Sequence, residues 1–197
     1  MLAPAIKHWI FDLDGTLTKP VHDFGEIRAM LGLRDDPEHG ILEQLAAMPD
    51  DRRAPLVARL DAFEYELARS AEPSDGAALL LEALRDRDAR VAIVTRNNVR
   101  NVDATLAATG LGDYFAPASV VTRETAVAPK PEPDGILWLL ERWRASPRDA
   151  VMIGNHMIDV AAGRAAGTLT VQIDQEGRFE WGRPADYHVR SLRELIA

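Results

Sequence analysis

The sequence predicts an α/β fold: a Rossmann-like parallel sheet with helices on both faces, joined to a small all-helical cap. Two observations lead to this class. Short apolar runs alternate along the chain with segments of helical periodicity, which is the pattern of βαβ units and a parallel sheet. The segment 19–74 breaks this alternation, because it contains helical patterns and no convincing strand. We therefore expect a core formed by residues 1–18 and 75–197, and a cap formed by residues 19–74.

The expected strands are short apolar runs with little alternation between polar and apolar residues. Parallel strands covered by helices on both faces have this composition, because neither face meets water. A weaker run, ASVVT at 118–122, predicts a further strand. The strong runs are HWIFDLD at 8–14, RVAIVTR at 90–96, DAVMIGN at 149–155 and TLTVQID at 168–174.

The expected helices of the core lie between these runs. Apolar residues at 136, 139, 140 and 143 recur at i, i+3, i+4 and i+7, which places them on one face of a helix. Similar patterns occupy 75–87, 99–106 and 159–167. In the cap, apolar residues at helical spacing predict three helices, around 27–31, 41–48 and 56–67.

The composition excludes several classes of function. The chain carries a formal net charge of −8 and no cysteine. It therefore lacks the broad basic surface that nucleic acids require, and it cannot form disulfides, cysteine-ligated zinc sites or thiol nucleophiles. No apolar run approaches the ~18 residues of a membrane span, and the N-terminal apolar stretch is too short for a signal peptide. We expect a cytoplasmic monomer or homodimer that binds neither nucleic acid nor membranes.

Polar side chains stand where three of the strong strands end. Ligands of an open α/β sheet bind at the carboxyl ends of its strands, so these side chains should meet. Clustered carboxylates need a cation or a shared proton, and an oxygen-rich site suits Mg²⁺. A threonine at a helix start and a lysine both favour a phosphate group. The set predicts phosphoryl transfer through a carboxylate nucleophile. Its members are Asp12, Asp14, Thr95, Lys130, Asn155 and Asp159.

These residues, in their order along the chain, resemble the four motifs of the haloacid dehalogenase superfamily in its phosphatase branch. Residues 12–16, DLDGT, match the family motif D-x-D-G-T. Thr95 ends a hydrophobic strand, Lys130 lies in PKPEP, and GNHMID at 154–159 matches G-D-x-x-x-D in part. The resemblance covers nearly the whole chain, and the 19–74 insertion stands where the family's first type of cap is inserted.

The resemblance implies a role for each residue. Asp12 would attack phosphorus and form an aspartyl-phosphate, while Asp14 would protonate the leaving oxygen and then deprotonate the attacking water. An acid at position 14 argues against dehalogenation, which needs no proton donor. The implied phosphate-binding residues are Gly15, Thr95, Arg96 and Lys130, with Thr95 and Lys130 counted among the catalytic residues. Mg²⁺ would be held by Asp12, the main-chain carbonyl of Asp14, Asp159 and Asn155.

One position departs from the family pattern. Asn155 stands where the family usually has aspartate, so an acceptor oxygen remains but a charge is lost, and we expect weaker Mg²⁺ binding. The implied function is a Mg²⁺-dependent phosphatase for a small phosphomonoester of the phosphoglycolate or sugar-phosphate type. A phosphomutase, a protein phosphatase and a catalytically weak phosphate- or metal-binding protein remain as alternatives.

Several cationic residues have less definite interpretations. Arg28, Arg52 and Arg53 in the cap are interpreted as parts of solvated helix faces, with recognition of a substrate carboxylate or a second anion as the alternative. For Arg96 and the adjacent Asn97, contact with the substrate or the cap and a place on the surface are both open.

Overall fold

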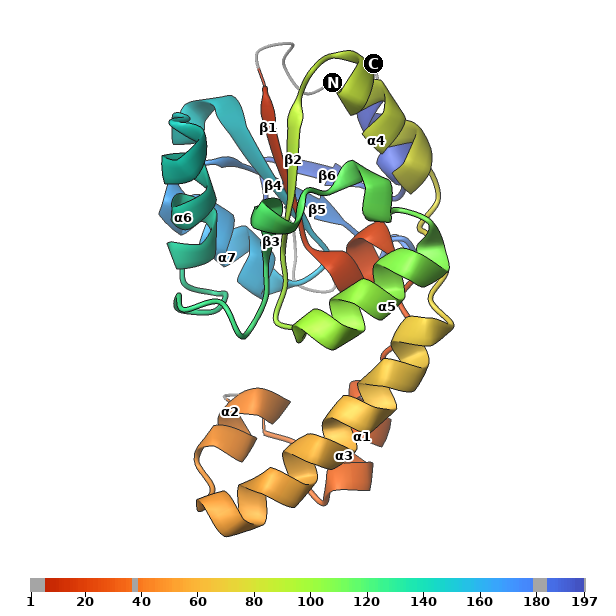
Figure 1. The fold of residues 1–197 in the computed structure, drawn as a ribbon, viewed down its shortest axis with the longest axis vertical. Coiled ribbons are helices and arrows are strands. Elements are labelled where there is room, and N and C mark those ends of the chain that lie inside the picture. Colours follow the sequence, from red (N-terminus) through yellow and green to blue (C-terminus); the bar gives the residue numbers. More distant parts are fainter. Residues whose placement is uncertain (1–5, 37–38, 179–183, 197) are drawn as a thin grey trace.

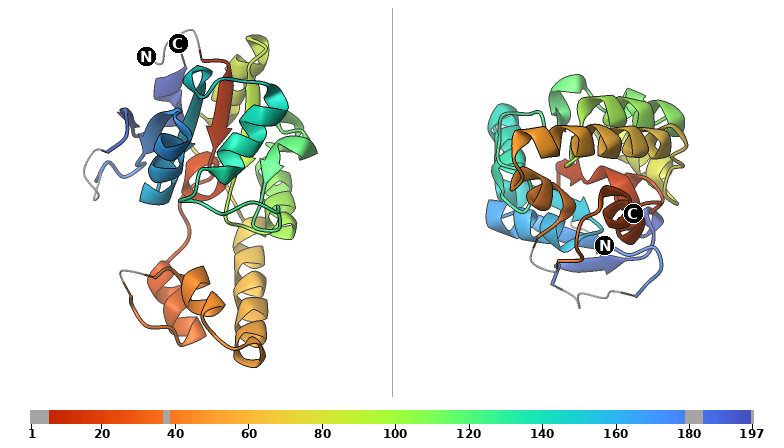
Figure 2. Two further views of the ribbon diagram at one scale, coloured as in Figure 1. Left: turned by 90° about the vertical axis from the view of Figure 1, so that its left-hand side faces the viewer. Right: turned by 90° about the horizontal axis from the view of Figure 1, so that it is seen from below.

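The computed structural model describes residues 6–36, 39–178 and 184–196. The chain forms an α/β body and a helical lobe, which we define as residues 24–69 (Figure 1). The lobe lies beyond the carboxyl ends of the strands, whereas the first strand, β1 (His8–Phe11), begins at the opposite end of the body (Figures 1 and 2). Residues 1–5, 179–183 and 197 of the predicted core and residues 37–38 of the predicted cap lie outside the described residues.

The body is built on a parallel sheet with the strand order β3-β2-β1-β4-β5-β6. Strand β1 pairs with β2 on one side and with β4 on the other, so it is central and the strand order reverses there. The predicted α/β class is confirmed, and each predicted strand is shorter than its apolar run. The strands are β1 (His8–Phe11), β2 (Arg90–Val94), β3 (Val120–Val121), β4 (Ala150–Gly154), β5 (Leu169–Ile173) and β6 (Tyr187–Val189).

Helices cover both faces of the sheet. Helices α4 (Ala77–Asp86) and α5 (Val99–Thr109) pack on one face, where they meet Phe11 and Ile93. Helices α6 (Asp134–Trp143) and α7 (Met157–Ala166) pack on the other, where Ile10 and Met152 point. Because successive strand residues point to opposite faces, a strand that is apolar at every position packs against the helices on both faces of the sheet. Short helical turns lie at Leu13–Leu17, Gly112–Tyr114, Pro117–Ser119, Pro147–Asp149 and Leu192–Leu195.

The helical lobe has a small core of its own. It contains α1 (Phe24–Leu31), α2 (Ile41–Ala46) and the long α3 (Asp50–Arg69). Ile27, Leu31, Leu45 and Leu60 are buried between these helices. Helix α3 runs on from this core and lies along α5 of the body, which fixes the lobe over the carboxyl edge of the sheet (Figure 2).

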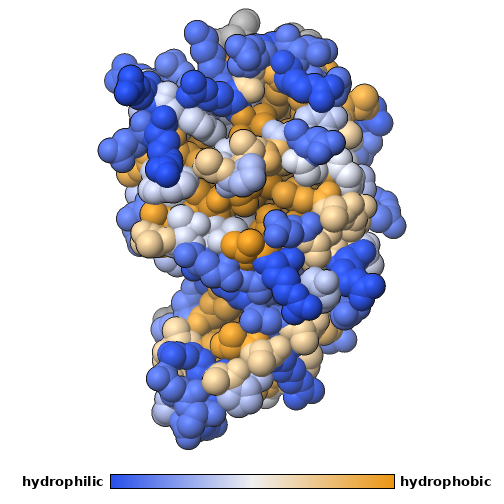
Figure 3. Space-filling model, viewed as in Figure 1, coloured by the Kyte–Doolittle hydropathy of each residue, from blue (hydrophilic) through white to orange (hydrophobic). Residues whose placement is uncertain are grey.

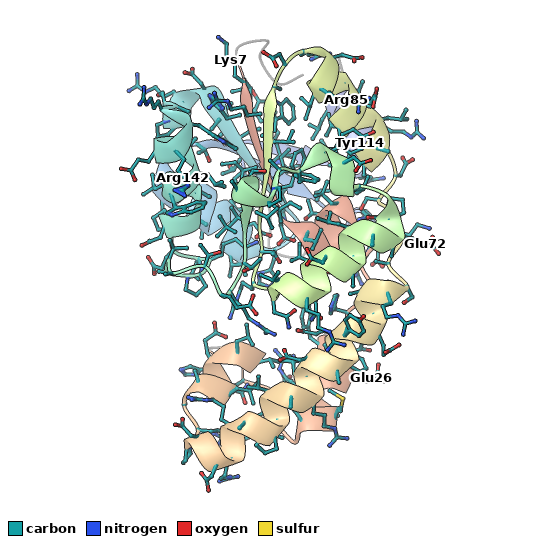
Figure 4. All side chains as sticks on the ribbon, in the orientation of Figure 1. Lys7, Glu26, Glu72, Arg85, Tyr114 and Arg142 are labelled. Carbon is teal, nitrogen blue, oxygen red and sulfur yellow. The ribbon has the colours of Figure 1, made fainter. Side chains whose placement is uncertain are left out.

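Two antiparallel linkers join the lobe to the body. Thr18 forms a bridge with Pro73, the amide of Lys19 donates to the carbonyl of Glu72 at 3.0 Å, and the amide of Ser74 donates to Leu17 at 2.9 Å. The side chains of Lys19 and Glu72 also pair at 2.5 Å. Figure 4 shows Glu72 where the chain passes between the two parts, and Glu26 on the lobe.

Candidate active site

The carboxyl end of β1 is the centre of the site. The ladder continues one residue past the strand, since the amide of Asp12 donates to the carbonyl of Ile153 at 2.8 Å. The chain then turns sharply through Gly15, whose φ of +79° is a conformation that other residues rarely adopt. A Cβ atom at Gly15 would lie 2.4 Å from the side-chain nitrogen Nδ2 of Asn155. The absence of a side chain at Gly15 therefore allows the turn to lie against Asn155, directly after β4. Asp12 and Asp14 stand just before this glycine, in the same stretch of chain.

Lys130 joins two buried carboxylates from different elements. Its Nζ lies 2.6 Å from Oδ1 of Asp12 and 2.6 Å from Oδ1 of Asp159, and the lysine side chain is only 2% exposed. The other oxygen of Asp159 accepts the amide of His156 at 2.9 Å, at the start of α7. The loop before α6, the end of β1 and the start of α7 are thus tied together by one ammonium group.

The charges at this point do not balance. The pKa of Asp12 is raised to about 7, mainly because the group is buried; Lys130 opposes this rise, and the nearby Asp159 and Asp14 carboxylates add to it. Burial alone would lower the pKa of Lys130, but the Asp12 and Asp159 carboxylates hold it above its usual value. Two carboxylates therefore share one ammonium group, with the carboxylate of Asp14 close enough to act on Asp12, and the site would accept a further positive charge.

The side chains of two threonines and two asparagines complete the body side of the site. Thr16 Oγ1 lies 3.3 Å from Oδ1 of Asn155 and 3.4 Å from Oδ2 of Asp12. Thr95, directly after β2, is buried, and its hydroxyl oxygen accepts the amide of Asn97 at 3.1 Å. The side-chain amide of Asn97 in turn donates to Asp14 Oδ2 at 3.0 Å. One set of hydrogen bonds therefore links the end of β1 to the end of β4, and a second set links it to the end of β2; together we call them the polar network.

A cavity of ≈ 300 Å³ separates this network from the helical lobe. The lobe contributes Phe24, Leu42, Leu60 and Glu64, and His22 of the preceding linker stacks on Phe24. In the space-filling view, hydrophilic and apolar side chains both border the waist between body and lobe (Figure 3). All eight predicted site residues line the cavity, namely Asp12, Asp14, Gly15, Thr95, Arg96, Lys130, Asn155 and Asp159.

Of the four arginines considered in the sequence, Arg96 and Arg28 line the cavity, whereas Arg52 and Arg53 do not. Arg96 lines the cavity and pairs with Glu43 of α2 at 2.5 Å, so it contacts the lobe. Arg28 also lines the cavity, and its Nε is buried without a hydrogen-bond partner. The side chain is only partly exposed and also lies 3.8 Å from Asp35 of the lobe, so Arg28 is not on a fully solvated face and borders the cavity, as its alternative interpretation requires. Arg52 is exposed, and Arg53 pairs with Asp50 at 2.5 Å.

The donor set fits a divalent cation of the magnesium type. Asp12 and Asp159 supply buried carboxylate oxygens, and Asn155 and the main chain at position 14 supply neutral ones. Within the described parts of the chain, no cluster of three or more His, Cys, Asp or Glu side chains could hold a metal ion. A cation here would therefore depend on the amide and main-chain oxygens as well as on carboxylates. The unbalanced charge around Asp12 is the observation that favours one.

Glu64 and Gln175 are not among the predicted site residues, and for Asn97 the sequence leaves contact with the substrate or the cap and a place on the surface both open. Asn97 contacts Asp14, Glu64 faces the cavity from α3, and Gln175 follows β5. The Nε2 of Gln175 lies 3.0 Å from the carbonyl of Gly15, 3.2 Å from that of Thr18 and 2.9 Å from Ser74 Oγ. It therefore fastens the turn after β1 to the linkers of the lobe. Asn97 has a weak sequence signal in its place beside Thr95, whereas Glu64 and Gln175 have none.

Comparisons with known proteins agree with this architecture. A model of the haloacid dehalogenase-like hydrolases matches residues 20–167. The chain therefore belongs to the haloacid dehalogenase-like hydrolases, as the motifs predict. The match defines an enzyme of the hydrolase class.

Individual relatives are similar along most of their length. A phosphoglycolate phosphatase of Nitrosospira multiformis is 29% identical over 96% of this chain and 93% of its own. An N-acetylmuramic acid 6-phosphate phosphatase of Pseudomonas aeruginosa is 27% identical over 97% and 93%. A subfamily IA hydrolase structure of this superfamily from Geobacter sulfurreducens superposes with a TM-score of 0.68 at 26% identity, over 98% and 95%. Among the described residues, none of the helices is both long and apolar enough to span a membrane.

The buried carboxyl group of Glu64 predicts a pH dependence of stability. Burial raises its pKa from 4.5 to about 7, with Asp14 and Asp61 adding to the shift and Arg123 opposing it. The folded state then holds a proton that the unfolded state has released, so stability falls as the pH rises from 4.5 to 7. Glu64→Gln, which stays neutral, should gain about 3 kcal/mol relative to the native protein across that window.

Urea denaturation at pH values below and above this window measures the effect. Glu66→Gln is the matched control, because Glu66 lies exposed on the same helix and pairs with Arg69 at 3.5 Å. The control should shift stability equally at both pH values. If Glu64→Gln also shifts it equally at both, Glu64 does not titrate as described.

Proposed function

We propose that the protein is a Mg²⁺-dependent phosphatase that hydrolyses a small phosphomonoester through an aspartyl-phosphate on Asp12. The observation that carries this proposal is the position of Asp12, which lies buried beside Lys130 in the cavity between body and lobe, with Asp14 two residues away. A carboxylate in contact with a lysine and facing a phosphate-sized space is suited to nucleophilic attack on phosphorus.

The proposed reaction has two steps. In the first, a carboxylate oxygen of Asp12 forms a bond to phosphorus, the bond to the leaving oxygen breaks, and Asp14 gives that oxygen a proton. In the second, Asp14 takes a proton from a water molecule that attacks the phosphoryl group and frees Asp12. Lys130, Thr95, Arg96 and the main chain at Gly15 hold the phosphoryl oxygens during both steps.

Mg²⁺ would be held by Asp12, Asp159, Asn155 and the main-chain carbonyl of Asp14. When bound, it would neutralise part of the charge that develops on the phosphoryl oxygens. The chain's own residues support this assignment, because Lys130 already balances one of the carboxylates and leaves the others to a cation.

The size and lining of the cavity support a small substrate. A volume of ≈ 300 Å³ lies at the lower end for ligand pockets, and the lobe blocks the approach of a folded protein. Two relatives are named for a small phosphorylated acid and for a phosphorylated amino sugar, which agrees with a phosphoglycolate or sugar-phosphate type of substrate. We further propose that residues 19–74 act as a cap that closes over the substrate and limits the access of water.

Phosphate release tests the proposal. Purified protein with Mg²⁺ should hydrolyse p-nitrophenyl phosphate, and Asp12→Asn should lower kcat by on the order of a thousand-fold or more, because the nucleophile is lost. Asp103→Asn is the control, since Asp103 is exposed on α5 and away from the cavity. Turnover by Asp12→Asn close to the native rate would rule out Asp12 as the nucleophile.

The proposed contact of Asn155 with Mg²⁺ predicts that substitutions at this position change the Mg²⁺ concentration needed for activity. Asn155→Asp adds a charged oxygen beside the proposed cation, so the Mg²⁺ concentration for half-maximal activity should fall about ten-fold. Asn155→Ala removes the oxygen and should raise that concentration. A Mg²⁺ titration of phosphate release that is the same for both variants would place the cation away from residue 155.

A further inference from the structure

We propose that Asn97 is a positioning residue for Asp14, and that Asn101 links this positioning to Glu64 of the helical lobe. This inference rests on the proposed function, in which Asp14 transfers the proton to the leaving oxygen. The contacts form a continuous series of side chains from the lobe to that carboxylate.

Asn97 is fixed by hydrogen bonds on every polar group. Its Nδ2 donates to Asp14 Oδ2 at 3.0 Å, and its main-chain amide donates to Thr95 Oγ1 at 3.1 Å. Its Oδ1 accepts the amide of Asn98 at 3.1 Å and Nδ2 of Asn101 at 3.0 Å. The residue is 7% exposed, so water cannot easily replace these partners. Rotation of the side chain would break the contact with Asp14 and two others together.

Asn101 determines which way the Asn97 amide faces. It is fully buried on α5, and its Nδ2 also lies 3.4 Å from Oε2 of Glu64. Its Oδ1 is buried without a hydrogen-bond partner. A flipped Asn101 amide would bring its oxygen against the acceptor oxygen of Asn97, so the observed orientation is the favourable one. The donor of Asn97 is consequently directed to Asp14.

Glu64 connects this series to the lobe. It lies on α3, 3.7 Å from Arg123 of the body, and Asp61 one turn earlier accepts Nδ2 of Asn98 at 3.2 Å. Arg123 also pairs with Asp61. The same docking of α3 on α5 that covers the cavity therefore supplies the partner of Asn101. The arrangement of Asp14 is completed only when the lobe is in this place.

The contact with Asn97 also decides where Asp14 carries its proton. An N–H group that donates to Oδ2 disfavours a proton on that oxygen, so the acid form carries it on Oδ1. As the phosphorus–oxygen bond of the ester breaks, the proton passes from Oδ1 to the leaving oxygen, and Asp14 becomes ionised. The hydrogen bond from Asn97 then strengthens, because its acceptor has gained charge.

The dependence of the rate on the leaving group tests this inference. An alkyl phosphate needs a proton on its leaving oxygen, whereas p-nitrophenyl phosphate releases a stable phenolate and needs one much less. Asn97→Ala should lower kcat/KM for the alkyl ester about ten- to a hundred-fold more than for the aryl ester. Asn97→Gln, which keeps an amide donor, should recover part of this loss. Asn101→Leu should give a smaller loss of the same pattern, and it tests the series if Asn97→Ala does not fold.

Asn98→Ser and Asp14→Asn are the two reference variants. Asn98→Ser keeps a cap for α5 but loses the contact with Asp61, so it should affect both esters equally. Asp14→Asn should show the largest leaving-group difference. If Asp14→Asn shows that difference and both Asn97→Ala and Asn101→Leu do not, the inference is wrong and the proposed function stands. If the native protein hydrolyses neither ester, the proposed function itself fails.

Discussion

The ion pairs of Lys130 are the interaction on which the rest of the site depends. A buried ammonium group is costly unless it is matched by opposite charge and hydrogen bonds, and here Asp12 and Asp159 each contact it at 2.6 Å. Since the three residues come from β1, α7 and the loop before α6, their contacts set the relative positions of those elements. The sheet places Asp12 at its centre, where the strand order reverses, and Lys130 holds its carboxylate in place.

The second constraint is the polar contact between the helical lobe and the body. Arg96 pairs with Glu43, and Arg123 lies beside Asp61 and Glu64. The contacts that hold the lobe on the body are therefore mainly charged and amide groups, while the apolar residues of the lobe pack in a core of its own. Such groups can be hydrated when the two parts separate, so this interface costs less to open than an apolar one. This is consistent with a lobe that covers a small cavity and releases what it contains.

The sequence predicted the residues of the body far better than those of the lobe. Asp12, Thr95 and Asn155 follow apolar strands, and the topology of a parallel sheet brings strand ends together whatever the details of the loops. Strand β6 was not predicted, because three residues with mixed polarity carry no periodic signal. Arg28 was assigned to a solvated helix face and Glu64 was not recognised, because the direction of a helical side chain depends on how the lobe docks, and that docking depends on contacts distant in sequence.

Direct detection of the phosphoryl group on Asp12 is the measurement that tests the account most directly. Asp14→Asn mixed with p-nitrophenyl phosphate and Mg²⁺ should release p-nitrophenol in an amount equal to the enzyme and then stall, because the proposed base for the second step is absent. Acid quenching and mass spectrometry of the peptides should then find one phosphoryl group, attached to Asp12. Release of p-nitrophenol with no phosphoryl group on Asp12, or with one on another residue, would contradict the account.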